Sequence, residues 1–411
     1  MSIGSHAIGF DRNAKTADEP AIPQKAVPSS VKRGISNRKG HESFRNPILF
    51  SALESERKHC FFVLLSYLSI PGALYAATGA NARSTVNPND MNLNTPPAIA
   101  GNIPQDVTER AGENAVFIVY GLKETPRTAD RIKDLCANFS AMIRSIRNRF
   151  PDMQFSCTMG FGADAWSRLF PERPKPRELE TFQEIKGARH TAVSTPGDLF
   201  FHIRGRQMGV CFEFASIIDE KLKGTVDPID EVHGFRYQDG KAIIGFVDGT
   251  ENPAVDENPY EFAVIGDEDS GFAGGSYIFV QKYLHDMNAW NALPVEEQEK
   301  TIGRKKFNDV ELSDEEKPAN AHNAVTNIQD SAGNDLKIVR ANMPFANTSK
   351  GEYGTYFIGY AGTFSTTRRM LENMFVGDPA GNTDRLLDFS TAVTGTLFFA
   401  PSYDLLETLG E

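Results

Sequence analysis

The sequence predicts an α+β protein made of two successive β-α-β-β-α-β units behind a long polar extension. Two observations support this prediction. From about residue 112, short apolar runs rich in β-formers alternate with longer segments of helical periodicity. The second half of the chain then repeats the same order of elements. Two units of one topology imply antiparallel sheets with helices packed on them.

The first unit is predicted to span residues 112–244. Its first strand, 115–120, is a short run of β-branched and aromatic residues that ends at Gly121. The helix that follows places Ile132, Leu135, Phe139 and Met142 on one face. The predicted elements, in chain order, are the strand 115–120, the helix 128–149, the strands 155–161 and 199–203, the helix 207–222 and the strand 231–237.

The second unit is predicted to span residues 245–405 and to repeat this order, which is that of the ferredoxin-like fold in a tandem arrangement of the dimeric α+β barrel type. A polar, acidic insert at 303–336 separates its first helix from its second strand. Polar loops of that length in a compact domain usually serve a ligand. The predicted elements are the strand 277–280, the helix 286–302, the strands 338–345 and 356–360, the helix 365–375 and the strand 397–399.

Composition excludes several classes of protein. The formal net charge is −11, and no basic stripe offsets it, which argues against nucleic-acid binding. The four cysteines show no CxxC spacing, which excludes zinc ribbons, thioredoxin-type redox centres and covalent c-type haem attachment. Cys136, Cys157 and Cys211 lie in apolar-patterned segments and are predicted to be core thiols.

Residues 1–105 are predicted to form a disordered extension, because prolines interrupt a Ser/Asn/Ala-rich stretch with little periodicity. Within it, the uncharged segment 60–82 follows basic residues and ends in Ala-Asn-Ala, the order of a secretory signal. It begins too deep for an ordinary signal peptide unless the true start lies downstream. A membrane anchor interrupted at Pro71-Gly72 and an unstructured apolar tail are the alternatives.

The predicted site centres on Gly-Phe-Val-Asp-Gly-Thr-Glu-Asn-Pro, residues 245–253. Gly245 and Gly249 permit a tight or left-handed backbone, so that another molecule can approach the main chain beside Asp248. A carboxylate on such a turn suits acid–base work in a pocket. The alternative for an isolated Asp-Gly is an Asx-turn or a helix cap.

From about residue 112 to 405, the chain resembles the dye-decolorizing peroxidases, most closely the bacterial branch that uses haem b. Beyond residues 245–253, the matching motifs follow in the family's order. They are Ala-Gly-Gly-Ser-Tyr at 273–277, Ile-Gly-Arg at 302–304, Ala-His at 321–322 and Ile-Val-Arg at 338–340. The family's fold is a pair of ferredoxin-like units, in agreement with the pattern of elements.

The resemblance implies a role for four residues. His322 matches the proximal ligand of the haem iron, although His190, His202, His233 and His285 are not excluded by spacing alone. The residues matching the distal side are Asp248 as acid–base, Arg340 as the cation that stabilises charge on the leaving oxygen, and Asn342 as a group that orients peroxide or water. Arg340 and Asn342 share side-chain parity on an extended strand.

Further residues match supporting roles around the haem. Asp384 matches an acid that hydrogen-bonds the proximal imidazole, with Asp388 as a close rival. Arg304 matches a propionate ligand, and Lys305 and Lys306 are alternatives. Phe357 matches an aromatic roof, and a core phenylalanine explains it equally well. The backbone at Thr250, Glu251 and Asn252 is expected to line the haem edge.

The resemblance implies a peroxidase with one non-covalent haem b, which reduces hydrogen peroxide through a ferryl state and oxidises a bulky one-electron donor such as a dye, phenol, metal ion or porphyrinogen. The alternatives are a haem-handling carrier, an enzyme related to chlorite dismutase and a haem-free module. The family also implies a homo-oligomer and a cytoplasmic location. Export or anchoring through the segment 60–82 remains the alternative.

Overall fold

The computed structural model describes residues 102–411, which belong to one compact unit. The predicted extension 1–105, with its candidate export segment 60–82, lies almost wholly outside the described residues. Within residues 102–411, no helix combines the length and the apolar character that crossing a membrane requires.

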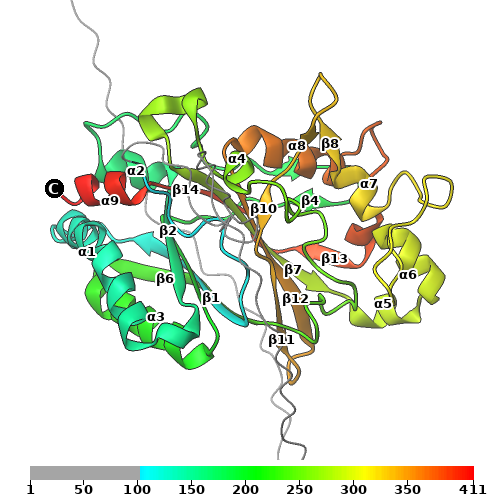
Figure 1. Cartoon of the computed structure of the whole chain (residues 1–411), viewed down its shortest axis with the longest axis horizontal. Coiled ribbons are helices and arrows are strands. Elements are labelled where there is room, and N and C mark those ends of the chain that lie inside the picture. The colour runs from blue at the N-terminus through cyan, green and yellow to red at the C-terminus, as the bar shows by residue number, and fades with distance from the viewer. Residues whose placement is uncertain (1–101) are drawn as a thin grey trace, which may run out of the picture. The chain divides into compact units, whose positions relative to one another are not determined.

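The first unit contains four long strands and two long helices, in the predicted order (Figure 1). The helix predicted at 128–149 has those bounds in the structure. The elements are β1 (Asn114–Leu122), α1 (Thr128–Arg149), η2 (Pro151–Met153), β2 (Ser156–Gly162), α2 (Ala163–Leu169), β3 (Ile185–Lys186), β4 (Thr191–Ala192), β5 (Leu199–Gly205), α3 (Met208–Leu222) and β6 (Val226–Phe235).

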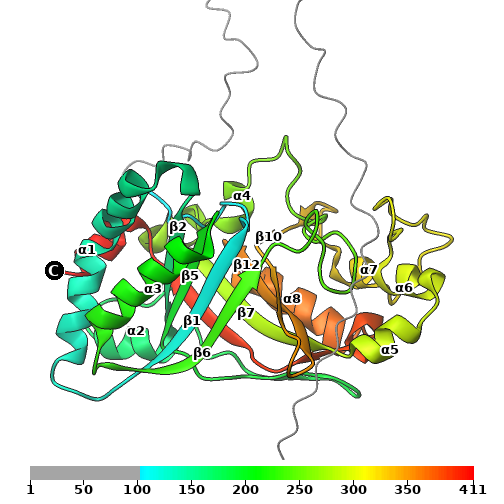
Figure 2. The same cartoon turned by 90° about the horizontal axis from the view of Figure 1, so that it is seen from below.

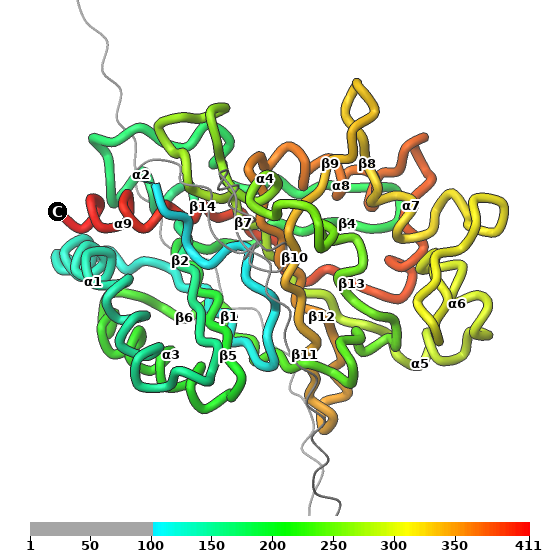
Figure 3. The backbone as a smooth tube through the Cα atoms, viewed as in Figure 1, coloured from blue at the N-terminus to red at the C-terminus, as the bar shows by residue number. Residues whose placement is uncertain are grey.

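The second unit repeats this order with more interruptions. Most of its strands and helices appear on the right of the backbone trace, whereas α9 lies on the left beside α1 (Figure 3). The elements are α4 (Tyr260–Ala263), η3 (Asp267–Phe272), β7 (Ser276–His285), α5 (Met287–Ala292), α6 (Val295–Ile302), α7 (His322–Thr326), β8 (Ile328–Gln329), β9 (Asp335–Leu336), β10 (Val339–Arg340), β11 (Met343–Asn347), β12 (Glu352–Ala361), α8 (Phe364–Phe375), η4 (Arg385–Asp388), β13 (Ser390–Ala392), β14 (Thr396–Ala400) and α9 (Tyr403–Leu409).

Both units arrange their strands in the ferredoxin-like order, which confirms the predicted fold class. The order is β2-β5-β1-β6 in the first unit and β10-β12-β7-β14 in the second, with β11 also paired to β12. Because β14 pairs with β2, the two units share one ten-stranded antiparallel sheet. The far edges also approach each other, since β6 lies beside β11. We call the volume enclosed by this curved sheet the barrel interior.

Each face of the sheet carries its own apolar core, because successive strand residues point to opposite sides. On β1, Val116 and Ile118 face the helices, whereas Phe117 and Val119 face the barrel interior. Figure 2 shows α1 and α3 at the left and α8 at the right, and residues of all three helices belong to the same core, so they cover the same outer face of the sheet. Cys136, Cys157 and Cys211 are buried free thiols among the described residues, as predicted.

Two elements of the second unit differ from the prediction. The helix predicted at 286–302 is two helices, α5 and α6, because Pro294 cannot donate the backbone hydrogen bond that a continuous helix requires. The strand predicted at 338–345 is interrupted between β10 and β11. The interruption falls at Ala341 and Asn342, where the side chain of Asn342 accepts the hydrogen bond from the backbone N–H of Ile358.

The boundary predicted between the units at 244/245 stays a prediction. In the structure, residues 242–252 form a turn-rich connection that packs on the helices of the second unit. Ala242, Ile244 and Phe246 share a small apolar cluster with Trp290 of α5 and Ile302 of α6.

Candidate active site

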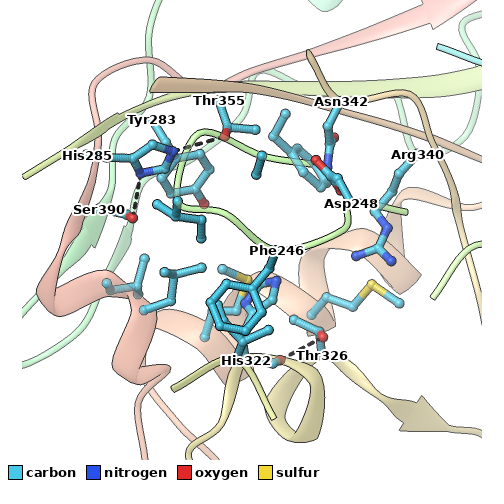
Figure 4. Close-up of a pocket in the computed structure, with 18 of the residues that line it drawn as sticks. Phe246, Asp248, Tyr283, His285, His322, Thr326, Arg340, Asn342, Thr355 and Ser390 are labelled. Atoms are coloured by element: carbon cyan, nitrogen blue, oxygen red, sulfur yellow. Dashed lines mark hydrogen bonds between the residues drawn. The ribbon is translucent and has the colours of Figure 1, made fainter. Parts of the chain in front are cut away.

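A cavity of about 1000 Å³, its open mouth included, lies in the second unit. It is bounded by β7 and β12, by the helices α7 and α8, and by the connection 242–248. Figure 4 shows its side chains. Most of the lining is apolar and includes Phe246, Ile302, Ile338, Met370, Leu371 and Met374. A pocket of this size with a few convergent polar groups is typical of a cofactor site.

The connection that carries Asp248 is held in a left-handed conformation on both sides of the acid. Gly245 has φ +94° and Gly249 has φ +82°, as their position in the sequence suggested. Nε1 of the buried Trp290 donates to the carbonyl oxygen of Ile244 at 2.9 Å. These constraints direct the Asp248 side chain into the cavity.

Asn342 holds Asp248 in place. Its Nδ2 donates to Oδ1 of Asp248 at 3.1 Å. Its Oδ1 accepts a bond from the backbone N–H of Ile358 at 3.0 Å, which is why the regular strand is interrupted here. The carboxamide therefore joins the acid on the connection to the strand β12.

Arg340 reaches the cavity beside this pair. The side chain of Asn252 bonds both backbone groups of Arg340, accepting from its N–H and donating to its carbonyl oxygen, each at 2.8 Å. Its guanidinium makes no ion pair with Asp248 in the described part of the chain, and its buried Nε has no hydrogen-bond partner there. An arginine whose Nε is buried without a partner is suited to an anionic ligand.

His322 lies on the other side of the cavity. It appears at the bottom of Figure 4, whereas Asp248, Asn342 and Arg340 lie at the upper right. Its Nδ1 is 2.6 Å from Oδ2 of the fully buried Asp384. A carboxylate only accepts hydrogen bonds, so Nδ1 carries a proton, and Nε2 is the ring nitrogen left for a metal. The other oxygen of Asp384 accepts from the N–H of Leu386.

A close packing contact places the helix α7, which begins at His322. Gly303 has φ +91°, and a Cβ built there would lie 1.8 Å from Oδ1 of Asn323. Nδ2 of Asn323 donates to Oε1 of Glu311 at 3.0 Å and to the carbonyl oxygen of Gly303 at 3.3 Å. Only a glycine at 303 lets the acidic insert hold His322 at this depth.

The other four histidines considered as iron ligands are hydrogen-bonded elsewhere. Only His285 among them also lines this cavity, and both of its ring nitrogens are occupied. The partners are Asp388 for His190, Tyr360 for His202, Glu231 for His233, and Ser390 and Thr355 for His285. His322 is therefore the imidazole available to a ligand in the cavity.

The sequence left His285 open as a rival iron ligand, but it did not indicate that both of its ring nitrogens would be hydrogen-bonded within the cavity wall. Nδ1 of His285 lies 2.8 Å from Oγ of Ser390, and Nε2 lies 2.9 Å from Oγ1 of Thr355. Tyr283, two residues earlier on β7, lines the cavity as well. The missed signal is the length of β7, which continues five residues beyond the predicted strand and points alternate side chains into the cavity.

Burial lowers the pKa of His285 to about 4. The unfolded chain binds this proton below about pH 6.5, and the folded chain does not until about pH 4. Stability is therefore complete above pH 6.5 and falls as the pH drops towards 4. We expect this histidine to cost about 2 kcal/mol of unfolding free energy between pH 7 and pH 5. Denaturant unfolding of the parent chain and of His285→Gln at pH 7 and pH 5 measures this loss. The same change in unfolding free energy between the two pH values in both proteins would contradict the expectation.

The structure places some predicted residues outside this cavity. Arg304 is held by Asp309, Glu251 and Glu311 at 3.0, 3.2 and 3.6 Å and is not part of the lining. It ties the turn after Asp248 to the acidic insert. Thr250 and Glu251 are half-buried and are also absent from the lining. Propionate binding by Arg304 and haem contact by 250–252 stay predictions.

Two predicted residues had competing assignments. Phe357 lines the cavity from β12, on the same face as Thr355. Asp384, rather than Asp388, bonds His322. Asp388 instead binds Arg189 and His190.

Residues 104–236 match the family model of the Dyp-type peroxidase N-terminal domain, and residues 239–405 match that of the C-terminal domain. The dye-decolorizing peroxidase of Rhodococcus erythropolis is 51% identical over 305 residues, which cover 74% of this chain and 88% of that protein.

Solved structures show the same similarity. A dye-decolorizing peroxidase from Bacteroides thetaiotaomicron is 80% identical, with a TM-score of 0.74 over 76% of this chain and 99% of that one. A variant of DypB from Rhodococcus jostii in complex with heme is 45% identical, with a TM-score of 0.72 over 74% and 98%. The chain therefore belongs to the Dyp-type peroxidase family, which confirms the prediction of a haem peroxidase of the dye-decolorizing type.

Proposed function

We propose that the cavity holds one non-covalent haem b between His322 and the group Asp248, Asn342 and Arg340, and that the chain uses it to reduce hydrogen peroxide with electrons from one-electron donors. One observation carries this proposal. The imidazole of His322, bonded to a carboxylate, lies on one side of an apolar cavity, and the acid, amide and guanidinium group lies together on another side (Figure 4).

The residues present fit the group that the family implies. A haem is a flat apolar macrocycle with two anionic propionates and an iron that takes an imidazole in peroxidases. The cavity supplies apolar walls, Nε2 of His322, and Nε of Arg340, which has no hydrogen-bond partner in the described part of the chain. Asp384 would fix the ring of His322 and make it a stronger donor to iron.

When bound, the haem supplies an iron that can accept both oxidising equivalents of peroxide. The chain's own groups supply the proton chemistry. Asp248 takes the proton from one peroxide oxygen and returns it to the other, which leaves as water. Arg340 stabilises the negative charge that develops on the leaving oxygen. Asn342 keeps the Asp248 carboxylate in reach of both oxygens.

A second cavity gives peroxide a route to the three distal residues when haem fills the first cavity. It is lined by Arg110, Arg236 and Lys241 and shares Asp248, Arg340 and Asn342 with the first. Peroxide is small and can reach Asp248 from that side. A haem carrier needs no distal acid, so this arrangement favours catalysis over haem delivery.

The test is to purify the chain with haem supplied and to mix it with peroxide in a stopped-flow instrument. We expect a Soret band, a rapid spectral change with peroxide and turnover of a dye donor, each absent in the haem-free chain. Haem binding with a peroxide reaction no faster than that of free haem would favour a carrier. Oxygen release from chlorite would favour the chlorite dismutase alternative.

Two finer properties are also proposed. We expect self-association, supported by the family resemblance and by the fully projecting ring of Phe307, which is 97% exposed. A relative from Mycobacterium smegmatis is described as an encapsulated peroxidase. Light scattering on the purified chain measures the mass. The predicted cytoplasmic location, or export through the segment 60–82, is decided by N-terminal sequencing of the native chain.

A further inference from the structure

A tyrosine and a histidine form a hydrogen-bonded pair in the barrel interior, outside the proposed haem cavity. The hydroxyl of Tyr360, on β12, lies 2.8 Å from Nδ1 of His202, on β5. Both residues have no exposed surface. The two strands belong to different units, so the pair forms only when the units share one sheet.

Aromatic rings close off one side of this pair. Phe117 stacks on His202 with the ring centroids 4.5 Å apart, and Tyr356 stacks on Phe117 at 4.1 Å. Nε2 of His202 has no hydrogen-bond partner among residues 102–411. Tyr360 is thus the one described residue with which this imidazole shares a hydrogen bond. The phenol of Tyr360 faces a proton acceptor, Nδ1 of His202, that is shielded from solvent.

The surroundings keep both groups neutral. Burial, and after it the Arg204 guanidinium, lower the pKa of His202 well below its usual value, so the ring keeps a lone pair. Burial raises the pKa of Tyr360 to about 12, so the phenol keeps its proton. The uncharged phenol can lose an electron only if its proton finds an acceptor, because an oxidised phenol is a very strong acid.

We propose that Tyr360 and His202 form a one-electron reservoir for the oxidising equivalents that the peroxidase reaction produces. The inference rests on the proposed function, which supplies the oxidant. One electron passes from the Tyr360 ring to the peroxide-oxidised haem, which is reduced by one equivalent. The phenolic O–H bond breaks, the proton moves to Nδ1 of His202, and a neutral tyrosyl radical remains. An electron from an external donor reverses the step, and the proton returns.

The strand β12 links the pair to the cavity. Phe357 lines the cavity from one face of β12, and Tyr360 lies three residues further on. Three residues of extended chain span about 10 Å. Between them, the N–H of Ile358 donates to Asn342, which in turn holds Asp248. The reservoir is therefore near the site of oxidation, yet buried away from bulky donors.

Freeze-quench EPR of the haem-loaded full chain, mixed with peroxide without a donor, tests the proposal. We expect a tyrosyl signal that narrows in protein labelled with ring-deuterated tyrosine. In Tyr360→Phe, which loses only the hydroxyl, we expect that signal to fall at least tenfold while the spectral change with peroxide keeps its rate. In His202→Gln, which removes the base, we expect a similar loss of the radical.

Tyr356→Phe is the matched control, because Tyr356 lies on the same strand and in the same core without a hydrogen bond to a histidine among the described residues. A signal that persists in Tyr360→Phe, or is lost in Tyr356→Phe instead, overturns the assignment. The absence of any tyrosyl signal in the labelled parent also overturns the assignment, and this result does not depend on whether a variant folds. If the haem-loaded parent shows no spectral change with peroxide, the proposed function fails, and the reservoir fails with it.

Discussion

Replacing His322 by alanine is expected to abolish the axial bond and most of the haem retention of the chain. His322 lines the cavity and its Nδ1 is bonded to Asp384, which leaves Nε2 as the ring nitrogen for the iron, and the three other polar groups proposed around the haem lie on a different side. Removal of the ligand should cost more than loss of its supporting acid, which typically costs roughly 10- to 100-fold in metal affinity. Haem content per chain and the visible spectrum measure the effect.

Two further variants bracket this result. Asp384→Asn keeps the shape of the buried side chain that bonds Nδ1 and removes its charge, so we expect haem retention between that of the parent and that of His322→Ala. His190→Ala removes a histidine bonded to Asp388 outside the cavity and should leave haem retention unchanged. Full haem loading and an unaltered spectrum in His322→Ala would show that another residue binds the iron.

Replacing Asp248 by alanine is expected to leave the haem spectrum intact and to slow the first reaction with peroxide about 10²- to 10⁴-fold, the usual worth of a positioned acid–base group. The physical reason is that no other carboxylate among the described residues lines this cavity. Arg340 can stabilise charge but cannot accept a proton. Stopped-flow absorbance at a series of peroxide concentrations gives the rate constant.

The control for this experiment is Asp256→Ala, which removes an exposed acid eight residues further along the chain and should react at the parental rate. A parental rate in Asp248→Ala itself would move the proton transfer away from this carboxylate, to water under the influence of Arg340. Asn342→Ala removes the hydrogen bond to Asp248 and keeps the acid, so its rate with peroxide should lie between the rates of the parent and of Asp248→Ala.

Much of the fold could be predicted from local patterns, because periodicity is a property of neighbouring residues. The helix α1 has the predicted bounds, and the strands β1 and β5 contain the predicted strands and extend one or two residues beyond them. The errors arose where a single residue opposes the pattern. Pro294 divides one apolar segment into two helices, and the side chain of Asn342 replaces a strand hydrogen bond.

The candidate site was predictable where motifs carry it and unpredictable where only packing does. The motif residues Asp248, His322, Arg340 and Asn342 meet at one cavity. His285 could not be excluded as an iron ligand from the sequence, because its hydrogen-bond partners Ser390 and Thr355 are distant in the chain. The motif did not indicate that three carboxylates from two segments surround Arg304 in the structure, and its contact with the cofactor stays a prediction.

By itself, the sequence determined the repeated unit, the family and the residue types that do the chemistry, because these depend on short-range pattern and on motif identity. Only the tertiary structure decided which acid supports His322, which histidines are already hydrogen-bonded, and that β14 joins β2 to make one sheet. Those choices are made by contacts between residues that are far apart in the chain, and local spacing carries no information about them.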